Sequence, residues 1–61
     1  MTYYNLNHLK VLVVDDFQPM RLIMKHVLHA LGIKDVVEAS NGEGALTMLQ
    51  AAPVDIVLLI I

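Results

Sequence analysis

The sequence predicts an α/β fold, in which three β-strands alternate with two α-helices around a parallel sheet. Apolar runs rich in β-branched residues occur at 9–14, 35–39 and 55–61. The segments between them repeat apolar side chains with the period of a helix. Strands and helices that alternate in this order form parallel sheets with right-handed crossovers. We therefore expect one small domain over residues 9–61, preceded by a polar lead-in over residues 1–8.

The first predicted strand ends in two adjacent carboxylates. Residues 9–14 are almost continuously apolar, which is typical of a strand that is buried on both faces in the middle of a parallel sheet. Asp15 and Asp16 follow this strand directly. Ligand sites in open α/β sheets lie beyond the carboxyl ends of the strands. These two aspartates are therefore the first candidates for a functional site.

A helix is predicted from about residues 17–19 to Leu31. Pro19 is favourable in its first turn, because the N–H that proline lacks would have no partner there. Gly32 follows the last apolar position, where helices often end in a left-handed residue. The side chains expected to pack on the sheet recur at intervals of three and four residues and are Met20, Ile23, Met24, Val27, Leu28 and Leu31.

Residues 35–39 predict a short second strand at a sheet edge, because charged residues accompany it. Ser40 and Glu43 have the spacing of a capping box, in which each side chain bonds a backbone N–H at the start of a helix. This second helix is expected over residues 42–51, and Pro53 stops it. Its expected core side chains are Ala45, Leu46 and Leu49, with Met48 at the margin.

The third predicted strand, residues 55–61, is apolar on both faces. Across the chain 57% of the residues are hydrophobic and the mean hydropathy is +0.66. A chain of this length buries only about 60% of the surface that it exposes when unfolded. We therefore expect part of the apolar surface to require a partner.

The composition also argues against several classes of function. Four basic residues against six acidic ones give a net charge of -2, and the basic residues form no run, which disfavours nucleic-acid binding. The absence of cysteine excludes disulfides and zinc thiolate sites. Residues 1–8 lack the pattern of a secretory signal, and no apolar run approaches the roughly 18 residues that a membrane span needs. The lack of cysteine leaves the compartment open, and a reducing cytoplasm fits it.

The motifs in combination resemble one known family. The acidic pair, Met20-Arg21, the glycine after the first helix, and Asn41-Gly42 occur in one order without gaps. In this respect the sequence is similar to the N-terminal half of a bacterial response-regulator receiver domain, particularly the single-domain chemotaxis type. The resemblance covers residues 9–61. It implies a flavodoxin-like fold with strand order 2-1-3, present here as a partial domain truncated in its third strand.

The resemblance implies phosphoryl-acceptor chemistry in two-component signalling. In this family the acidic pair binds Mg²⁺, and an aspartate at the end of the third strand accepts a phosphoryl group from a histidine kinase or phosphotransfer protein. Asp15 and Asp16 match the acidic pair, and Mg²⁺ is commonly held by one or two carboxylates with water and phosphate oxygens. The acceptor position falls on Ile60, whose side chain has no nucleophilic atom.

This departure leads us to expect a chain that is not phosphorylated and binds Mg²⁺ weakly or not at all. The family's other two site residues, a Ser or Thr after a fourth strand and a Lys after a fifth, would lie beyond Ile61. Asp55 is not a substitute acceptor, because it precedes the third strand and would lie at the opposite end of the sheet. His26 and His29 have no third ligand nearby in sequence and are expected to be solvated.

Three classes of function remain open. The first is a receiver module of the phosphorelay, which is not an enzyme. The second is a pseudo-receiver that acts in protein–protein interaction or dimerisation. The third is a Mg²⁺-dependent hydrolase, which is disfavoured because such enzymes usually separate the two aspartates by one residue. In addition, residues 56–61 would present an unpaired apolar strand edge, through which we expect a homodimer or higher oligomer.

Overall fold

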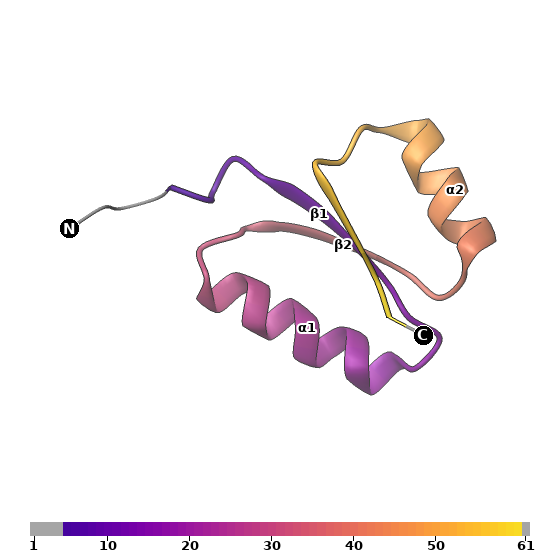
Figure 1. The fold of residues 1–61 in the computed structure, drawn as a ribbon, viewed down its shortest axis with the longest axis horizontal. Helices are drawn as coiled ribbons and strands as arrows, with labels where there is room; N and C mark the ends of the chain where they lie inside the picture. The colour runs from indigo at the N-terminus through magenta and orange to yellow at the C-terminus, as the bar shows by residue number, and fades with distance from the viewer. Residues whose placement is uncertain (1–4, 61) are drawn as a thin grey trace.

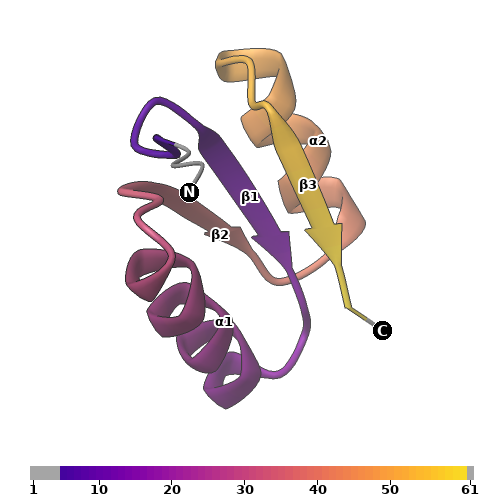
Figure 2. The same ribbon diagram turned by 60° about the vertical axis from the view of Figure 1, so that its left-hand side comes forward.

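The computed structural model describes residues 5–60 and contains a three-stranded parallel sheet with two helices (Figures 1 and 2). The strand order is β2-β1-β3, and all strand pairs are parallel. This arrangement confirms the predicted fold and strand order. The elements follow one another along the chain as β1 (Lys10–Val14), α1 (Gln18–Ala30), β2 (Asp35–Ala39), α2 (Gly42–Ala51) and β3 (Ile56–Leu59).

The core is built around β1, because α1 and α2 lie on opposite faces of the sheet (Figure 1). Successive side chains of a strand point to opposite faces. Val11 and Val13 accordingly pack with Leu28 on the α1 face. Leu12 and Val14 pack with Ala45 on the α2 face. The central strand is thereby removed from solvent on both sides, as its continuous apolar sequence predicted.

The strand register brings three chain segments to one edge of the sheet. Val14, the last residue of β1, is aligned with Ala39 of β2 and with Leu59 of β3. The backbone ladder continues one residue further on both sides. The Asp15 N–H donates to the Ala39 carbonyl at 3.1 Å, and the Ile60 N–H donates to the Val14 carbonyl at 2.9 Å. The segments that follow all three strands are therefore neighbours.

The ends of α1 agree with the sequence. Pro19 lies in the first turn, and Gly32 has a positive φ of 95° just after the helix. The Ile33 N–H donates to the Leu28 carbonyl and the Gly32 N–H to the His29 carbonyl, both at 3.0 Å. This pair of bonds is a Schellman motif, which ends the helix and brings Ile33 onto Leu28 in the core.

The expected apolar stripe of α1 is only partly correct. Leu28 is buried and Met24 packs against the same cluster, but Ile23, Val27 and Leu31 are 47–59% exposed. The helix faces the sheet with a side that is shifted toward Arg21, which contacts β2. The side of α1 that faces the sheet thus combines apolar packing with a polar contact to a neighbouring strand, which the hydrophobic period alone does not show.

The start and the core face of α2 also differ from prediction. The N-cap is Asn41 and not Ser40, since the Asn41 Oδ1 accepts from the Gly44 N–H at 2.7 Å. On the sheet-facing side Ala45 is buried and Met48 packs against the core, whereas Leu46 and Leu49, which were predicted to be in the core, are 62% and 37% exposed. The change of N-cap residue does not account for the exposure of these leucines. Leu46 is exposed because it lies next to Ala45 in sequence, about 100° around the helix.

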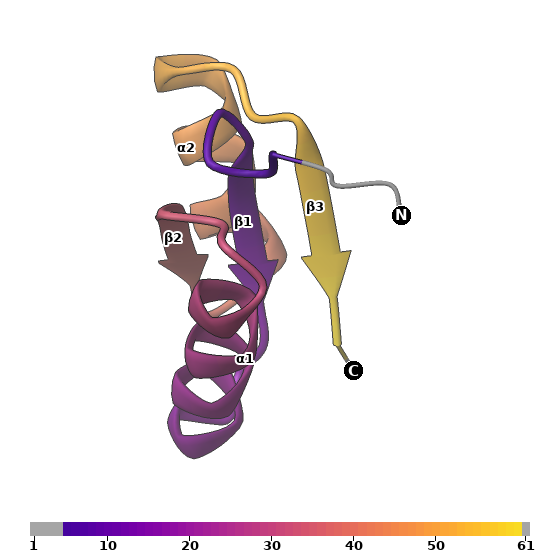
Figure 3. The same ribbon diagram turned by 90° about the vertical axis from the view of Figure 1, so that its left-hand side faces the viewer.

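The strand β3 is the least covered part of the sheet. Among the described residues, the backbones of α1 and α2 lie over β1 and β2, whereas β3 stands apart from both helices (Figure 3), and Leu58 joins the core cluster that includes Leu28. Its side chains Val57 and Leu59 are 46% and 63% exposed. Within residues 5–60, neither helix has the length and apolar character needed to cross a bilayer.

Candidate functional site

A cleft of about 220 Å³ lies at the carboxyl-terminal edge of the sheet. It is formed where the three strands end, so its walls come from segments that are distant in sequence. Both residues of the acidic pair contribute to it, which places the candidate carboxylates at the edge predicted from the sequence. The lining residues are Val14, Asp15, Asp16, Ser40, Asn41, Gly42, Leu59 and Ile60.

Asp15 is buried and held by three hydrogen bonds. Its side chain accepts from the Phe17 N–H through Oδ1 at 3.0 Å, which is a local turn typical of aspartate. Its backbone N–H donates to the Ala39 carbonyl at 3.1 Å. Its carbonyl accepts from Nη1 of Arg21 at 2.6 Å. Two of these bonds hold the backbone and one holds the side chain of a residue that is only 5% exposed and lines the cleft.

Asp16 differs from Asp15 because it is exposed. It does not cap α1, since the N-cap position is occupied by Phe17. The acidic pair thus combines one fixed carboxylate with one that faces solvent. Two adjacent carboxylates of this kind can provide ligands to a divalent cation while leaving room for water.

A network of charged side chains supports the loop from the α1 side. Nε of Arg21 donates to Oε1 of Glu38, which lies on β2, at 3.2 Å. Lys25, one turn further along α1, places its Nζ 3.7 Å from Oε2 of the same glutamate. The Arg21 side chain is only 14% exposed, so this pair is screened less than a surface ion pair.

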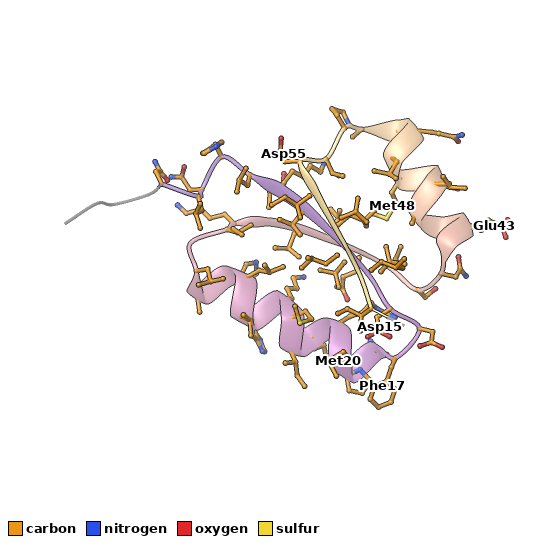
Figure 4. All side chains as sticks on the ribbon, viewed as in Figure 1. Asp15, Phe17, Met20, Glu43, Met48 and Asp55 are labelled. Atoms are coloured by element: carbon orange, nitrogen blue, oxygen red, sulfur yellow. The ribbon has the colours of Figure 1, made fainter. Side chains whose placement is uncertain are left out.

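The other acidic and histidine candidates lie elsewhere. Asp55 is at the opposite end of the sheet from Asp15 (Figure 4), where Oδ2 accepts from the Lys10 N–H and the Asp55 N–H donates to the Lys10 carbonyl, both at 2.8 Å. This confirms the predicted position of Asp55. His26 and His29 are exposed on α1, as expected. Within residues 5–60, no three His, Cys, Asp or Glu residues are placed to hold a metal ion together.

A protein-family model described as the response regulator receiver domain matches residues 11–61. The chain belongs to this family. The receiver chain is 43% identical over 51 residues to chemotaxis protein CheY-3 of Vibrio cholerae, which covers 84% of this chain and 39% of the relative. It is 45% identical over 47 residues to chemotaxis protein CheY of Pseudomonas aeruginosa, covering 77% of this chain and 38% of the relative. No solved structure gives a significant match.

The family match and these sequence identities support the predicted resemblance to chemotaxis receivers. The chain spans about two fifths of the length of these curated relatives. In this receiver chain the C-terminal end of β3 is entirely aliphatic. Ile60 is half-buried, lines the cleft and packs against the cluster of Val11 and Leu28. It offers the cleft no oxygen or nitrogen from its side chain.

Two residues of the receiver site were not given a role from the sequence. Asn41 lines the cleft and caps α2, whereas the capping-box spacing had favoured Ser40. Arg21 belongs to the family motif, but its contact with the Asp15 carbonyl depends on the turn between β1 and α1. A basic residue six positions after an acidic one is too common a pattern to indicate such a contact.

Proposed function

We propose that this chain acts in two-component signalling as a partial receiver domain over residues 9–61, with a Mg²⁺ site at Asp15 and Asp16 and no phosphoryl acceptor at position 60. The observation that carries this proposal is the convergence of Asp15, Asp16 and Ile60 on one cleft at the carboxyl edge of the sheet. All three residues line this cleft, which supports the proposal.

The donor set fits a partly hydrated Mg²⁺ ion. Mg²⁺ binds hard oxygen ligands and usually keeps several waters, so two adjacent carboxylates are sufficient protein ligands. When bound, Mg²⁺ would neutralise negative charge on a phosphoryl group in the cleft. The role of Asp15 is to offer a carboxylate whose position is fixed by its bond from the Phe17 N–H. Asp16, which is exposed, completes the pair.

Ile60 makes phosphorylation of this chain unfavourable on chemical grounds. An acyl phosphate forms on a carboxylate, and an isoleucine side chain has no atom that can attack phosphorus. The partner expected from the family is a histidine kinase or phosphotransfer protein. We propose that the chain meets such a partner without accepting its phosphoryl group.

A Mg²⁺ titration followed through the amide resonances of Asp15 and Asp16 tests the metal site. With only two carboxylate ligands, we expect saturable binding in the millimolar range that is lost in Asp16→Asn. Asp55→Asn is the matched control, because it removes the same charge at the opposite end of the sheet. Equal loss of binding in both variants, or no saturable shift at all, would refute the proposed site.

Incubation with acetyl phosphate and Mg²⁺, followed by mass spectrometry, tests the acceptor assignment. We expect no phosphoryl adduct on the chain. A stable adduct mapped to Asp15, Asp16 or Asp55 would show that another carboxylate accepts the phosphoryl group. Ile60→Asp alone should not restore efficient phosphorylation by acetyl phosphate, because the family's later Ser/Thr and Lys positions are not within these 61 residues.

A second proposed property of the 61-residue chain is self-association through β3. Within residues 5–60, β3 pairs with β1 on one side and no strand pairs with its other side. Exposed apolar strand edges template pairing with another chain. The closed solution is a two-fold dimer in which two β3 strands meet antiparallel, giving the order 2-1-3-3′-1′-2′. Light scattering across a dilution series tests it, and a folded monomer at micromolar concentration would contradict it.

A further inference from the structure

Arg21 joins three parts of the molecule. It is the fourth residue of α1, its Nη1 donates to the carbonyl of Asp15 at 2.6 Å, and its Nε donates to Glu38 of β2 at 3.2 Å. The guanidinium is planar and presents its donors in a fixed fork, so the two contacts set each other's geometry. Its side chain is 14% exposed, which leaves it little freedom to move.

The contact with Asp15 joins a side chain of α1 directly to the backbone of the acidic pair, whereas the N–H groups of Met20 and Arg21 bond the carbonyl of Phe17 at the start of the helix. The other two bonds of Asp15 run to Ala39 on β2 and to Phe17 within the loop. A carbonyl that accepts from a charged donor makes a stronger hydrogen bond than one that accepts from a neutral donor. Arg21 therefore contributes strongly to fixing the backbone that carries both carboxylates.

Glu38 determines where the guanidinium lies. It accepts from Arg21 and lies 3.7 Å from Lys25, so two positive charges of α1 converge on one carboxylate of β2. Without Glu38, the guanidinium would be attracted to the nearby acidic pair, where it would compete with a cation for the same oxygens. The negative charge of Glu38 thus holds the positive charge of Arg21 at the carbonyl of Asp15.

We propose that Arg21 is a positioning residue for the acidic pair, held in place by Glu38, and that it strengthens cation binding at Asp15 and Asp16 although it is itself positively charged. This inference rests on the proposed Mg²⁺ site. It assigns to the network of Arg21 and Glu38 a role beyond packing α1 on the sheet.

The charge and the position of Arg21 have opposite effects on Mg²⁺ affinity. As a positive charge near two carboxylates, Arg21 repels the cation, so its neutralisation would tighten binding. As a donor that fixes the loop, it improves binding, so its loss would weaken binding. Arg21→Lys separates the two effects, because lysine keeps the charge but has no planar fork that reaches two acceptors.

The test compares the Mg²⁺ affinity of wild type, Arg21→Lys and Lys25→Met. The amide shift of Asp16 reports binding in each titration. We expect binding about tenfold weaker in Arg21→Lys, the lower end of the range for residues that support metal ligands. Lys25→Met removes a positive charge from the same helix and takes away the second basic partner of Glu38. This variant should bind Mg²⁺ with unchanged or slightly higher affinity. Unchanged or tighter binding in Arg21→Lys would overturn the proposal.

Amide hydrogen exchange without metal provides a second, independent measurement. Exchange at Asp15 and Phe17 should accelerate in Arg21→Lys relative to Leu12, whose amide reports global opening, and should stay unchanged in Lys25→Met. If wild type binds no Mg²⁺, the metal site fails, and this measurement still decides whether Arg21 holds the loop. If Arg21→Lys does not fold, the amides of Asp15 and Phe17 must exchange faster in Glu38→Gln than in wild type. Unchanged exchange at these two amides in Glu38→Gln refutes the proposal.

Discussion

The strands β1 and β3 have almost the same chemical character and very different surroundings. Each contains four consecutive aliphatic residues, Val11-Leu12-Val13-Val14 in β1 and Ile56-Val57-Leu58-Leu59 in β3. The four residues of β1 are at most 3% exposed, whereas Leu59 is 63% exposed. The difference arises because β1 has a strand on each side and a helix on each face. Hydropathy therefore identifies a strand, and its neighbours decide whether it is buried.

The largest expected effect compares Leu12→Ala with Leu59→Ala. Leu12 is fully buried, so its truncation should cost about 2–5 kcal/mol of the free energy of unfolding. A domain of this size rarely has more than roughly 3–5 kcal/mol in total, so Leu12→Ala should be largely unfolded. Leu59→Ala should cost about 0.5 kcal/mol or less in the dilute monomer. Urea denaturation measures both, and equal costs would contradict the contrast between the two strands.

A charge introduced into each strand sharpens the same contrast. Val57→Lys places an ammonium group on an exposed side of β3, so the chain should stay folded and the proposed dimer should dissociate. Val13→Lys places the same group in the core, where an unpaired charge should prevent folding. Circular dichroism and light scattering distinguish these outcomes. A Val57→Lys variant that still associates as wild type does would exclude β3 as the interface.

A smaller effect is expected at the start of α2, the helix that covers β1 but not β3. Asn41→Ala removes the acceptor for the Gly44 N–H and should cost about 1 kcal/mol. Ser40→Ala is the control and should be nearly neutral, because Ser40 does not cap the helix. Hydrogen exchange should show faster opening at Leu12 in the first variant only. The reverse ranking would restore Ser40 as the cap.

Much of the fold follows from local sequence. The alternation of apolar runs and helical periods, Pro19 at the start of α1 and Gly32 at its end are determined within a few residues, and the structure confirms them. The orientation of α1 was not predictable in this way, because the contacts that α1 makes with the sheet join residues that are distant in sequence, such as Arg21 and Glu38, which are 17 residues apart. Ile23 was assigned to the core for its period and lies 55% exposed.

The candidate site, like the fold, was predictable from the sequence only in part. Asp15 and Asp16 stand out in the sequence because they end an apolar strand, and the structure places them at the predicted edge. Their metal-binding role stays a prediction. The support from Arg21 could not be recognised from sequence, because the bond to the Asp15 carbonyl requires the backbone to turn between β1 and α1. Asn41 was missed as a cap because Ser40 and Glu43 have equally suitable spacing.

A Mg²⁺ titration of Ile60→Asp tests the central claim most directly, namely that position 60 shares a cleft with Asp15 and Asp16 and supplies no ligand to it. A third carboxylate at this position should raise Mg²⁺ affinity by at least about tenfold over wild type. Ile56→Asp adds the same charge at the other end of β3 and should leave the affinity unchanged. Equal affinity in Ile60→Asp and wild type would contradict the proposed site.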